Sequence, residues 1–481
     1  ALAGADIVFN LSASDELIGK HDYLKSLLSQ QSARTMTGYV YSSCGFGEST
    51  QDVVYGGNAM IYENGKLLAE AARFSLEPQI MMTQIDVEKL RSERRGNSTY
   101  VNAQRNVKFS LLDKQFGIRI IDAFSKEMER EFKLERTISP HPFIPAMEDM
   151  EVSCEEIFNI QVMGLVKRLV HTHAETAVIG ISGGLDSTLA LLVCVKAFDK
   201  LKRSRKGIVG VTMPGFGTTG RTYNNAMELM RSLGITVKEV SIVDAVTQHF
   251  EDINHDISVH DVTYENSQAR ERTQVLMDMA NKLNGMVVGT GDLSELALGW
   301  ATYNGDHMSM YGVNASVPKT LIRYLVNYVA QREVDDQSAQ TLQDIIETPI
   351  SPELIPADEK GNIQQKTEDL VGPYELHDFF LYYFLRFGFS PKKIFMLAKN
   401  AFIENKSKRV KLGPNDPETY DEETIKKWLR VFVRRFFSQQ FKRSCLPDGP
   451  KVGSVSLSPR GDWRMPSDAM AAMWMQDAEN M

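Results

Sequence analysis

The segment from 155 to 288 alternates apolar, strand-like runs with amphipathic, helix-like runs, and this alternation restricts the chain to few folds. The spacing predicts helices over 155–171, 187–197, 222–233 and 268–283, and strands over 177–181, 208–212, 236–241 and 286–288. Strands that alternate with helices of this length form right-handed βαβ units, so we expect an α/β fold with a doubly wound parallel sheet. Such a sheet binds ligands at the carboxyl ends of its strands, which makes the loops after 181, 212 and 288 the candidate sites.

The sequence on either side predicts a separate N-terminal part and a helical C-terminal part. Residues 1–112 have a mixed α/β pattern, with strands expected over 6–11, 39–43 and 81–88 and a helix over 20–37. A hairpin is expected to pair 58–61 with 66–69 around the Asn64-Gly65 turn. Residues 113–150 predict a linker, which leaves 151–481 as a second domain that is mostly helical after 321. Because 1–10 reads as a helix end that enters a strand, we expect that sequence upstream of it is missing.

Composition and charge disfavour several classes of protein. The 62 acidic residues outnumber the 54 basic ones and give a formal charge of −8, which disfavours loose binding to nucleic acid or to an anionic membrane. Since no apolar run is long enough to span a bilayer, we expect neither a membrane span nor a signal peptide. The four cysteines are scattered and the histidines lack a metal-ligand spacing, so we expect a cytoplasmic enzyme without disulfides or zinc.

The strongest candidate site is the loop after the first strand of this sheet, GISGGLDST over 180–188. Adjacent glycines let the backbone approach a phosphate closely, and the helix that we expect to begin at Ser187 adds its positive end. The loop lacks the lysine of a Walker A motif, so γ-phosphate transfer in the P-loop manner is not expected. Asp186 instead offers a hard oxygen to Mg²⁺, while Ser182 and Ser187 offer hydroxyls to a pyrophosphate. Taken alone, the same residues would describe a tight turn with a helix cap.

This loop resembles the pyrophosphate loop of the N-type ATP pyrophosphatases, which cleave ATP to AMP and pyrophosphate while they activate a carboxylate or carbonyl. Other segments are similar to the glutamine-dependent NAD⁺ synthetases, namely 264–270, 289–300, 313–320, 372–379 (GPYELHDF) and 441–467. Residues 1–110 resemble the second half of the nitrilase-like glutaminase domain of that family, through NLSAS at 10–14 and YVYSSCGFGESTQD at 39–52. The resemblance implies an ATP pyrophosphatase domain after a partial nitrilase-like αββα domain.

The resemblance also implies a reaction, in which ATP adenylates the nicotinate carboxylate of deamido-NAD⁺ and ammonia then displaces AMP to give NAD⁺. The implied ATP contacts are Gly180, Ile181, Ser182, Gly183, Gly184, Leu185, Asp186, Ser187, Thr290 and Lys319, and the implied Mg²⁺ ligands are Asp186 and Glu295. The implied deamido-NAD⁺ contacts are Asn266, Arg272, Glu295, Trp300, Ala301, Thr302, Tyr303 and Lys442. Residues 212–217 look like an adenine or ribose contact, and Asp306 like a further metal or substrate ligand. By position alone, Lys319 would be a surface lysine and Trp300 a core residue.

The glutaminase of this family uses a Glu-Lys-Cys triad whose three members lie upstream of the stretch that the chain resembles. We therefore expect this chain alone to use ammonia and not glutamine. Ser14 and Lys20 fall where the family binds glutamine, although an arginine is more familiar at the second position. Cys44 is expected to be an inert packing residue. The family tends to assemble through its synthetase domains, so a homo-oligomer is also expected.

Three other functions compete with this interpretation. A tRNA-acting adenylating enzyme of the same superfamily is favoured only by the basic segment 426–443 and is opposed by the acidic overall charge. An amidase within 1–110 lacks a candidate triad unless Cys44 is the nucleophile. A non-catalytic nucleotide sensor would have no reason to retain Asp186, Glu295 and Lys319 together.

Overall fold

The computed structural model describes residues 1–48, 51–109, 121, 132–217, 220–348, 370–405, 409, 411, 417 and 419–481. The chain divides into two compact units, Ala1–Thr137 and Ile138–Met481, and each is described by itself. The division falls inside the predicted linker, most of whose residues before 132 lie outside the described part of the chain. The predicted domain limits at 112 and 150 stay predictions.

The first unit contains a four-stranded sheet in the order β1-β2-β3-β4. Strand β1 (Ile7–Ser12) runs parallel to β2 (Gly38–Ser43), and β3 (Ala59–Glu63) and β4 (Lys66–Glu70) add to it antiparallel. Helix α1 (Lys20–Thr35) packs on this sheet through Leu28, and α2 (Val87–Gly96) and α3 (Ser98–Phe109) follow. The predicted hairpin is confirmed, because Asn64 and Gly65 both take the positive φ that a tight two-residue turn requires.

The predicted strand over 81–88 is wrong. Residues 81–86 pair with no strand in the described part of the chain, and α2 begins at Val87. Asp86 stops the extended run, because its side chain accepts a hydrogen bond from the Lys89 amide and so caps the helix.

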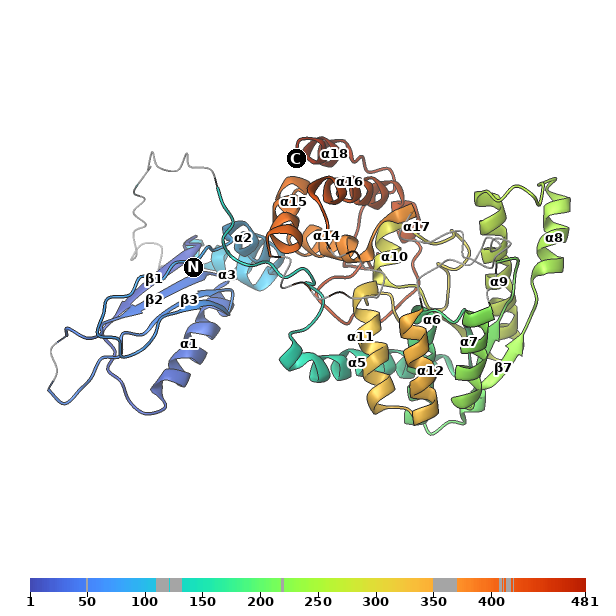
Figure 1. Cartoon of the computed structure of the whole chain (residues 1–481), viewed down its shortest axis with the longest axis horizontal. Helices are drawn as coiled ribbons and strands as arrows, with labels where there is room; N and C mark the ends of the chain where they lie inside the picture. The colour runs from blue at the N-terminus through green and yellow to red at the C-terminus, as the bar shows by residue number, and fades with distance from the viewer. Residues whose placement is uncertain are drawn as a thin grey trace. The chain divides into compact units, whose positions relative to one another are not determined.

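The second unit is built on a five-stranded, all-parallel sheet (Figure 1). Its strands, in spatial order, are β7 (Thr236–Glu239), β6 (Ile208–Thr212), β5 (Thr176–Gly180), β8 (Gly285–Gly289) and β9 (Tyr311–Gly312). The chain moves outward from β5 through β6 to β7 and then returns to the other side of β5 at β8. This reversal creates a crevice between the carboxyl ends of β5 and β8, which is the usual place for a ligand in such a sheet.

Alternate strand residues build two separate cores, so the sheet is buried on both faces as predicted. On one face, Ala177 and Ile179 pack with the helices α5 (Met150–Thr172), α6 (Leu185–Lys200), α7 (Gly220–Ser232), α11 (Lys319–Arg332) and α12 (Asp336–Glu347). On the other face, Val178 and Val209 pack with the helices α8 (Val243–Asp252) and α9 (Val262–Lys282). Short 3₁₀ turns lie at Met147–Asp149 and Arg205–Gly207. Near-continuous apolar strands are typical of this doubly covered arrangement.

Several predicted helix limits differ from the structure, and one helix was missed. Helix α6 begins at Leu185 and not at Ser187, because Gly184 in an extended conformation is its N-cap. Helix α9 begins at Val262, six residues earlier than expected, because the Asp261 side chain accepts hydrogen bonds from the amides of Thr263 and Tyr264 and so caps the helix. Helix α8 was not predicted, although Val246 and Phe250 mark its buried face.

The remaining helices form a layer over the end of the sheet that bears the crevice. They are α10 (Leu293–Leu298), α14 (Tyr374–Phe387), α15 (Pro391–Lys399) with a π-helical extension Asn400–Glu404, α16 (Glu422–Ser438), α17 (Gln440–Arg443) and α18 (Ala472–Glu479). Figure 1 shows α14, α15, α16 and α18 grouped together in orange to dark red. Their core is aromatic, with Phe384 packed against Phe432, Phe436 and Trp474. Within the described residues, none of the helices combines the length and the apolar character that crossing a membrane would need.

His377 of α14 makes stability depend on pH. Its Nε2 lies 2.6 Å from the Val371 carbonyl oxygen, and burial lowers its pKa from 6.5 to about 4. Because the folded state resists protonation that the unfolded chain accepts below pH 6.5, stability falls as the pH drops from 6.5 towards 4. We expect His377 to account for a loss of about 2 kcal/mol between pH 7.5 and pH 5 in urea unfolding. His377→Gln should lose this pH-dependent part of the unfolding free energy. The control His249→Gln, at an exposed position, should keep it. Parallel profiles of unfolding free energy against pH for the wild type and His377→Gln would contradict the assignment.

Candidate active site

The loop between β5 and α6 lies at the crevice and has the geometry of a phosphate cradle. Gly183 has a φ of +88°, and a Cβ atom there would lie 2.2 Å from the Thr222 carbonyl oxygen, so only glycine fits. The Ser182 and Ser187 hydroxyls lie 3.2 Å apart, and Gly184 leaves the first amides of α6 without a side-chain cap. Uncapped amides at a helix N-terminus favour an anion.

A buried charge cluster lies at the start of α6, where one ammonium group meets three carboxylates. The Lys319 Nζ atom is 2.6 Å from Asp186 Oδ2, 2.7 Å from Asp292 Oδ2 and 2.9 Å from Glu295 Oε1. We call these four residues the acidic centre. Lys319 is only 5% exposed, so the alternative that it is a surface lysine is wrong. The lysine is buried among carboxylates that come from the start of α6 and from the start of α10.

The acidic centre has the donor set of a divalent cation site. Asp186, Asp292 and Glu295 each offer a carboxylate oxygen, and these oxygens lie within 4.8 Å of one another. Burial, together with the charge of Asp186, raises the pKa of Glu295 to about 7, and burial also raises the pKa of Asp292. The single positive charge of Lys319 therefore does not balance the negative charge of three carboxylates. The buried Asp186 Oδ1 atom also lacks a hydrogen-bond partner, so these residues fit Mg²⁺.

Asp292 and Asn314 were missed by sequence reasoning. Asp292 forms a capping box with Glu295 at the start of α10, and its position between Thr290 and Glu295 was the available signal. The buried Asn314 donates to the carbonyl oxygens of Asp186 and Thr290, each at 3.0 Å, and so ties the phosphate loop to the loop after β8. Asn314 lies in the segment 313–320 that carried the resemblance, but its partners are distant in sequence.

The second half of the site is the loop Gly299–Tyr303 after α10. Asn266 accepts a hydrogen bond from the Thr302 hydroxyl at 2.8 Å, and Asp306 accepts one from the Thr302 amide at 2.6 Å. The Tyr303 ring stacks on His307, which sequence reasoning had not singled out. Arg272 points from α9 and donates to the Met213 carbonyl oxygen.

Three cations from α16 and α17 hold α10 and this loop through backbone carbonyl oxygens. Lys442 Nζ donates to Gly299 and Ala301 at 2.8 and 2.6 Å. Arg435 donates to the Leu298 carbonyl oxygen, and its guanidinium lies 5.3 Å from the Trp300 ring centre. The buried Arg443 donates to the carbonyl oxygens of Leu296 and Ala297 at the end of α10. This segment therefore organises the loop that carries the tryptophan.

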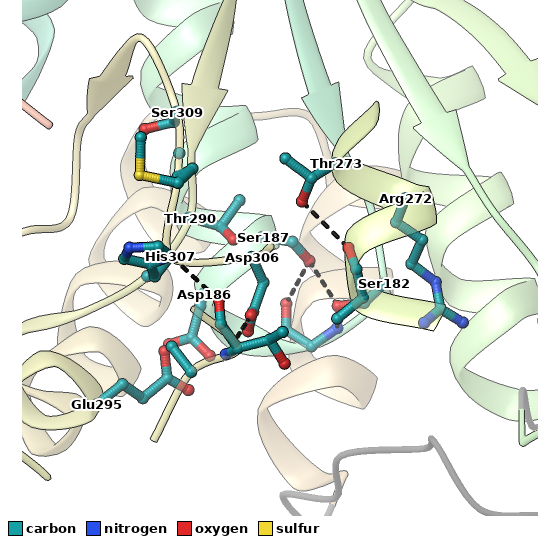
Figure 2. Close-up of a pocket in the computed structure, with 18 of the residues that line it drawn as sticks. Ser182, Asp186, Ser187, Arg272, Thr273, Thr290, Glu295, Asp306, His307 and Ser309 are labelled. Atoms are coloured by element: carbon teal, nitrogen blue, oxygen red, sulfur yellow. Dashed lines mark hydrogen bonds between the residues drawn. The ribbon is translucent and has the colours of Figure 1, made fainter. Parts of the chain in front are cut away.

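The phosphate loop, the acidic centre and the Gly299–Thr302 segment line one cavity of about 630 Å³. Every residue that we predicted to contact ATP or deamido-NAD⁺ lies on its wall except Tyr303, whose ring packs beside it on His307 and Phe441. Of the predicted adenine or ribose contact at 212–217, Thr212, Met213 and Pro214 also line it, whereas 215–217 do not; Asp306 lines it as well. Figure 2 shows Asp186 and Glu295 on one side of the cavity and Arg272 with Thr273 on the other. The carboxylates of the acidic centre and the ring of Trp300 thus line the same cavity.

In the first unit, Ser14 and Lys20 stay predicted glutamine contacts. The Ser14 amide donates to Ser43 Oγ at 3.2 Å, and Lys20 pairs with Asp15 at 2.8 Å at the start of α1. Cys44 is a half-buried free thiol directly after β2.

Comparison with known proteins identifies the family. A family model described as NAD synthase matches residues 157–409. A glutamine-dependent NAD(+) synthetase of Mycobacterium leprae is 43% identical over 499 aligned residues, which cover 100% of this chain and 71% of the relative. The chain belongs to the glutamine-dependent NAD(+) synthetases. A glutamine-dependent NAD(+) synthetase of Aquifex aeolicus is 26% identical and is matched over 97% of this chain and 71% of its own length.

The fold agrees with that of this synthetase family. A crystal structure of a glutamine-dependent NAD(+) synthetase from Cytophaga hutchinsonii superposes with a TM-score of 0.52 at 18% identity, covering 99% of this chain and 71% of that one. The expected α/β fold with a parallel sheet is confirmed. The alternative of a tRNA-acting enzyme gains no support from these NAD(+) synthetase relatives, and the family assignment makes NAD⁺ synthesis the activity of the chain.

Proposed function

We propose that the chain makes NAD⁺ in two steps within the one cavity. In the first step, an oxygen of the nicotinate carboxylate of deamido-NAD⁺ bonds to the α-phosphorus of ATP, and the bond to the β-phosphate breaks to release pyrophosphate. In the second step, the nitrogen of ammonia bonds to the acyl carbon, the bond to AMP breaks and a proton is lost. The observation that carries this proposal is the acidic centre beside the phosphate loop, with Trp300 lining the same cavity.

Each part of the site has a role in this proposal. The 180–187 loop binds the pyrophosphate end of ATP, because its uncapped amides and the helix dipole favour negative charge. Lys319 offsets the charge that builds on the leaving pyrophosphate. Asp186 and Glu295 hold Mg²⁺, with Asp292 beside them, and the bound ion supplies further positive charge to the phosphates. Thr290 contacts ATP from the adjoining loop.

The remaining residues bind the dinucleotide that carries the carboxylate. We assign Asn266, Arg272, Trp300 and Thr302 to deamido-NAD⁺, since an aromatic ring, an amide and a guanidinium suit a charged nucleotide. Lys442 acts on the same loop through the Gly299 and Ala301 carbonyl oxygens. When glutamine is the nitrogen source, ammonia would come from its hydrolysis, for which Ser14 and Lys20 are the proposed glutamine contacts.

The test supplies the nitrogen directly. Purified chain is incubated with ATP, Mg²⁺, deamido-NAD⁺ and ammonium chloride, and NAD⁺, AMP and pyrophosphate are quantified by chromatography. We expect the three products in equal amounts. ADP and phosphate in place of AMP and pyrophosphate would contradict the proposal.

Lys442→Met tests the deamido-NAD⁺ end of the site. The variant loses two charge-assisted hydrogen bonds that hold the Trp300 loop, so we expect KM for deamido-NAD⁺ to rise about ten- to a hundredfold, or roughly 1.4–3 kcal/mol. KM for ATP should change much less, because the Lys442 side chain donates to the Trp300 loop and has no hydrogen bond to the phosphate loop among the described residues. Lys427→Met, which removes an exposed lysine of the neighbouring helix α16, is the matched control. Equal changes in both KM values would exclude this role.

A further inference from the structure

The segment 372–379 carried part of the family resemblance but has no role in the scheme above. It begins α14, and its Asp378 is buried with 2% exposure. Asp378 Oδ1 accepts a hydrogen bond from the Ser294 hydroxyl of α10. Asp378 Oδ2 accepts hydrogen bonds from the Thr320 amide at 3.0 Å and from the Thr320 hydroxyl at 2.7 Å. One carboxylate therefore joins α10, α11 and α14.

This carboxylate is one hydroxyl away from the acidic centre. The Ser294 Oγ atom that donates to Asp378 accepts a hydrogen bond from the Lys319 amide at 2.8 Å. Lys319 is the first residue of α11, and its Nζ atom contacts carboxylates from α6 and from the start of α10. Tyr374, one turn before Asp378, places its ring centre 5.3 Å from the same Nζ atom. Asp378 thus reaches the main chain of Lys319 through the Ser294 hydroxyl, and Tyr374 contacts the Lys319 ammonium directly.

We propose that Asp378 is a positioning residue that sets Lys319 between the phosphate loop and Glu295. Three hydrogen-bond donors converge on the two oxygens of Asp378, and a carboxylate can accept from all three. The side-chain amide of an asparagine would have to turn its N–H₂ group, itself a donor, towards at least one of them. The negative charge also lies at the N-terminus of the 14-residue helix α11, where the helix dipole favours it. Without this anchor, the Ser294 hydroxyl that accepts from the Lys319 amide and the Thr320 amide that follows lose their common acceptor, so α14 no longer holds the start of α10 and the start of α11 together.

The neighbouring residue Glu375 provides a matched control. It is also buried in the first turn of α14, but its carboxylate pairs with Arg409 and His141 and has no contact with α10 or α11 among the hydrogen bonds of the described residues. Glu375→Gln therefore removes a buried charge from the same helix turn without touching Lys319. A loss of stability in the helical layer would affect both variants, whereas a loss of Lys319 positioning would affect only the Asp378 variant.

The experiment measures Asp378→Asn in the full chain and rests on the proposed function for its assay. We expect KM for ATP to rise at least about tenfold, with less than about a threefold change in KM for deamido-NAD⁺. The affinity for a non-hydrolysable ATP analogue with Mg²⁺, measured by calorimetry, should fall by a similar factor. In a Lys319→Met background, Asp378→Asn should change that affinity less than about twofold, because its effect acts through Lys319.

Other outcomes overturn the proposal. Equal effects of Asp378→Asn and Glu375→Gln on ATP, or additive effects of Asp378→Asn and Lys319→Met, would reduce Asp378 to a structural residue. If circular dichroism shows that Asp378→Asn does not fold, Ser294→Ala is measured in its place. This variant removes only the hydroxyl between Asp378 and the Lys319 amide. A wild-type affinity of Ser294→Ala for the ATP analogue would then refute the proposal. Failure of the wild-type chain to form NAD⁺ would instead refute the proposed function, while the calorimetric comparison would still test Asp378.

Discussion

Replacing Asp186 by alanine should abolish pyrophosphate release from ATP and deamido-NAD⁺ when ammonium and Mg²⁺ are supplied. Asp186 is the carboxylate that the phosphate loop itself brings to the acidic centre, and its Oδ1 atom is a buried oxygen without a hydrogen-bond partner. Its loss removes a proposed Mg²⁺ ligand and one of the three carboxylates that hold the Lys319 ammonium. We expect kcat/KM to fall at least about a thousandfold, which corresponds to roughly 4 kcal/mol of transition-state stabilisation.

Asp199 of the same helix is the control for this substitution. It lies near the opposite end of α6 and pairs with Arg205 at the surface, so Asp199→Ala should retain activity. The assay is a coupled measurement of pyrophosphate with NAD⁺ quantified in parallel. Near-normal turnover by Asp186→Ala would remove Asp186 from the metal and phosphate site.

Gly183→Ala should also inactivate the chain, for a steric reason. The backbone at Gly183 has the left-handed conformation, which costs an alanine about 1–2 kcal/mol, and the added methyl group would meet the main chain of α7 at Thr222. Because a carbonyl group of a helix cannot rotate away as a side chain does, the phosphate loop must move. We expect affinity for ATP to fall more than about a hundredfold and the free energy of unfolding to decrease by about 2 kcal/mol or more.

Gly184→Ala is the control that distinguishes the steric clash at 183 from the mere replacement of a glycine in this loop. Gly184 has an extended conformation, and a Cβ atom there would meet nothing closer than Ser182 Oγ at 3.5 Å. Gly184→Ala should therefore unfold in urea at nearly the wild-type midpoint, whereas Gly183→Ala should unfold earlier. Equal midpoints for the two variants would show that the loop accepts a side chain at 183.

The parallel sheet and the phosphate loop could be predicted because their signals are local. Apolar runs of strand length between amphipathic helices indicate buried strands, and a glycine pair directly after such a run indicates a close approach of backbone to ligand. The start of α6 was placed two residues late because Asp186 and Ser187 look like caps, whereas Gly184 takes that position. A cap is decided by backbone conformation, which residue type indicates only in part.

The acidic centre was predicted only in part because it is assembled from distant segments. Asp186, Glu295 and Lys319 were each predicted as site residues. Nothing in the sequence indicates that the Lys319 ammonium contacts both carboxylates, or that Asp292 is a third partner. The burial of Lys319 in particular depends on carboxylates that lie 24 to 133 residues away along the chain. Lys442 was expected to contact the substrate, and its hydrogen bonds to two backbone carbonyl oxygens could not be read from residue type.

Helix α10 has only six residues and therefore spans about 9 Å. Its first turn carries Glu295, and the tryptophan loop follows its last residue. Asp378 fixes one end through Ser294, and Arg443 fixes the other through two carbonyl oxygens. A helix this short and anchored at both ends keeps its first turn and the following loop in a fixed relation. If the substrates bind as proposed, this short helix holds Glu295, near the phosphates of ATP, at a fixed distance from the loop that carries Trp300.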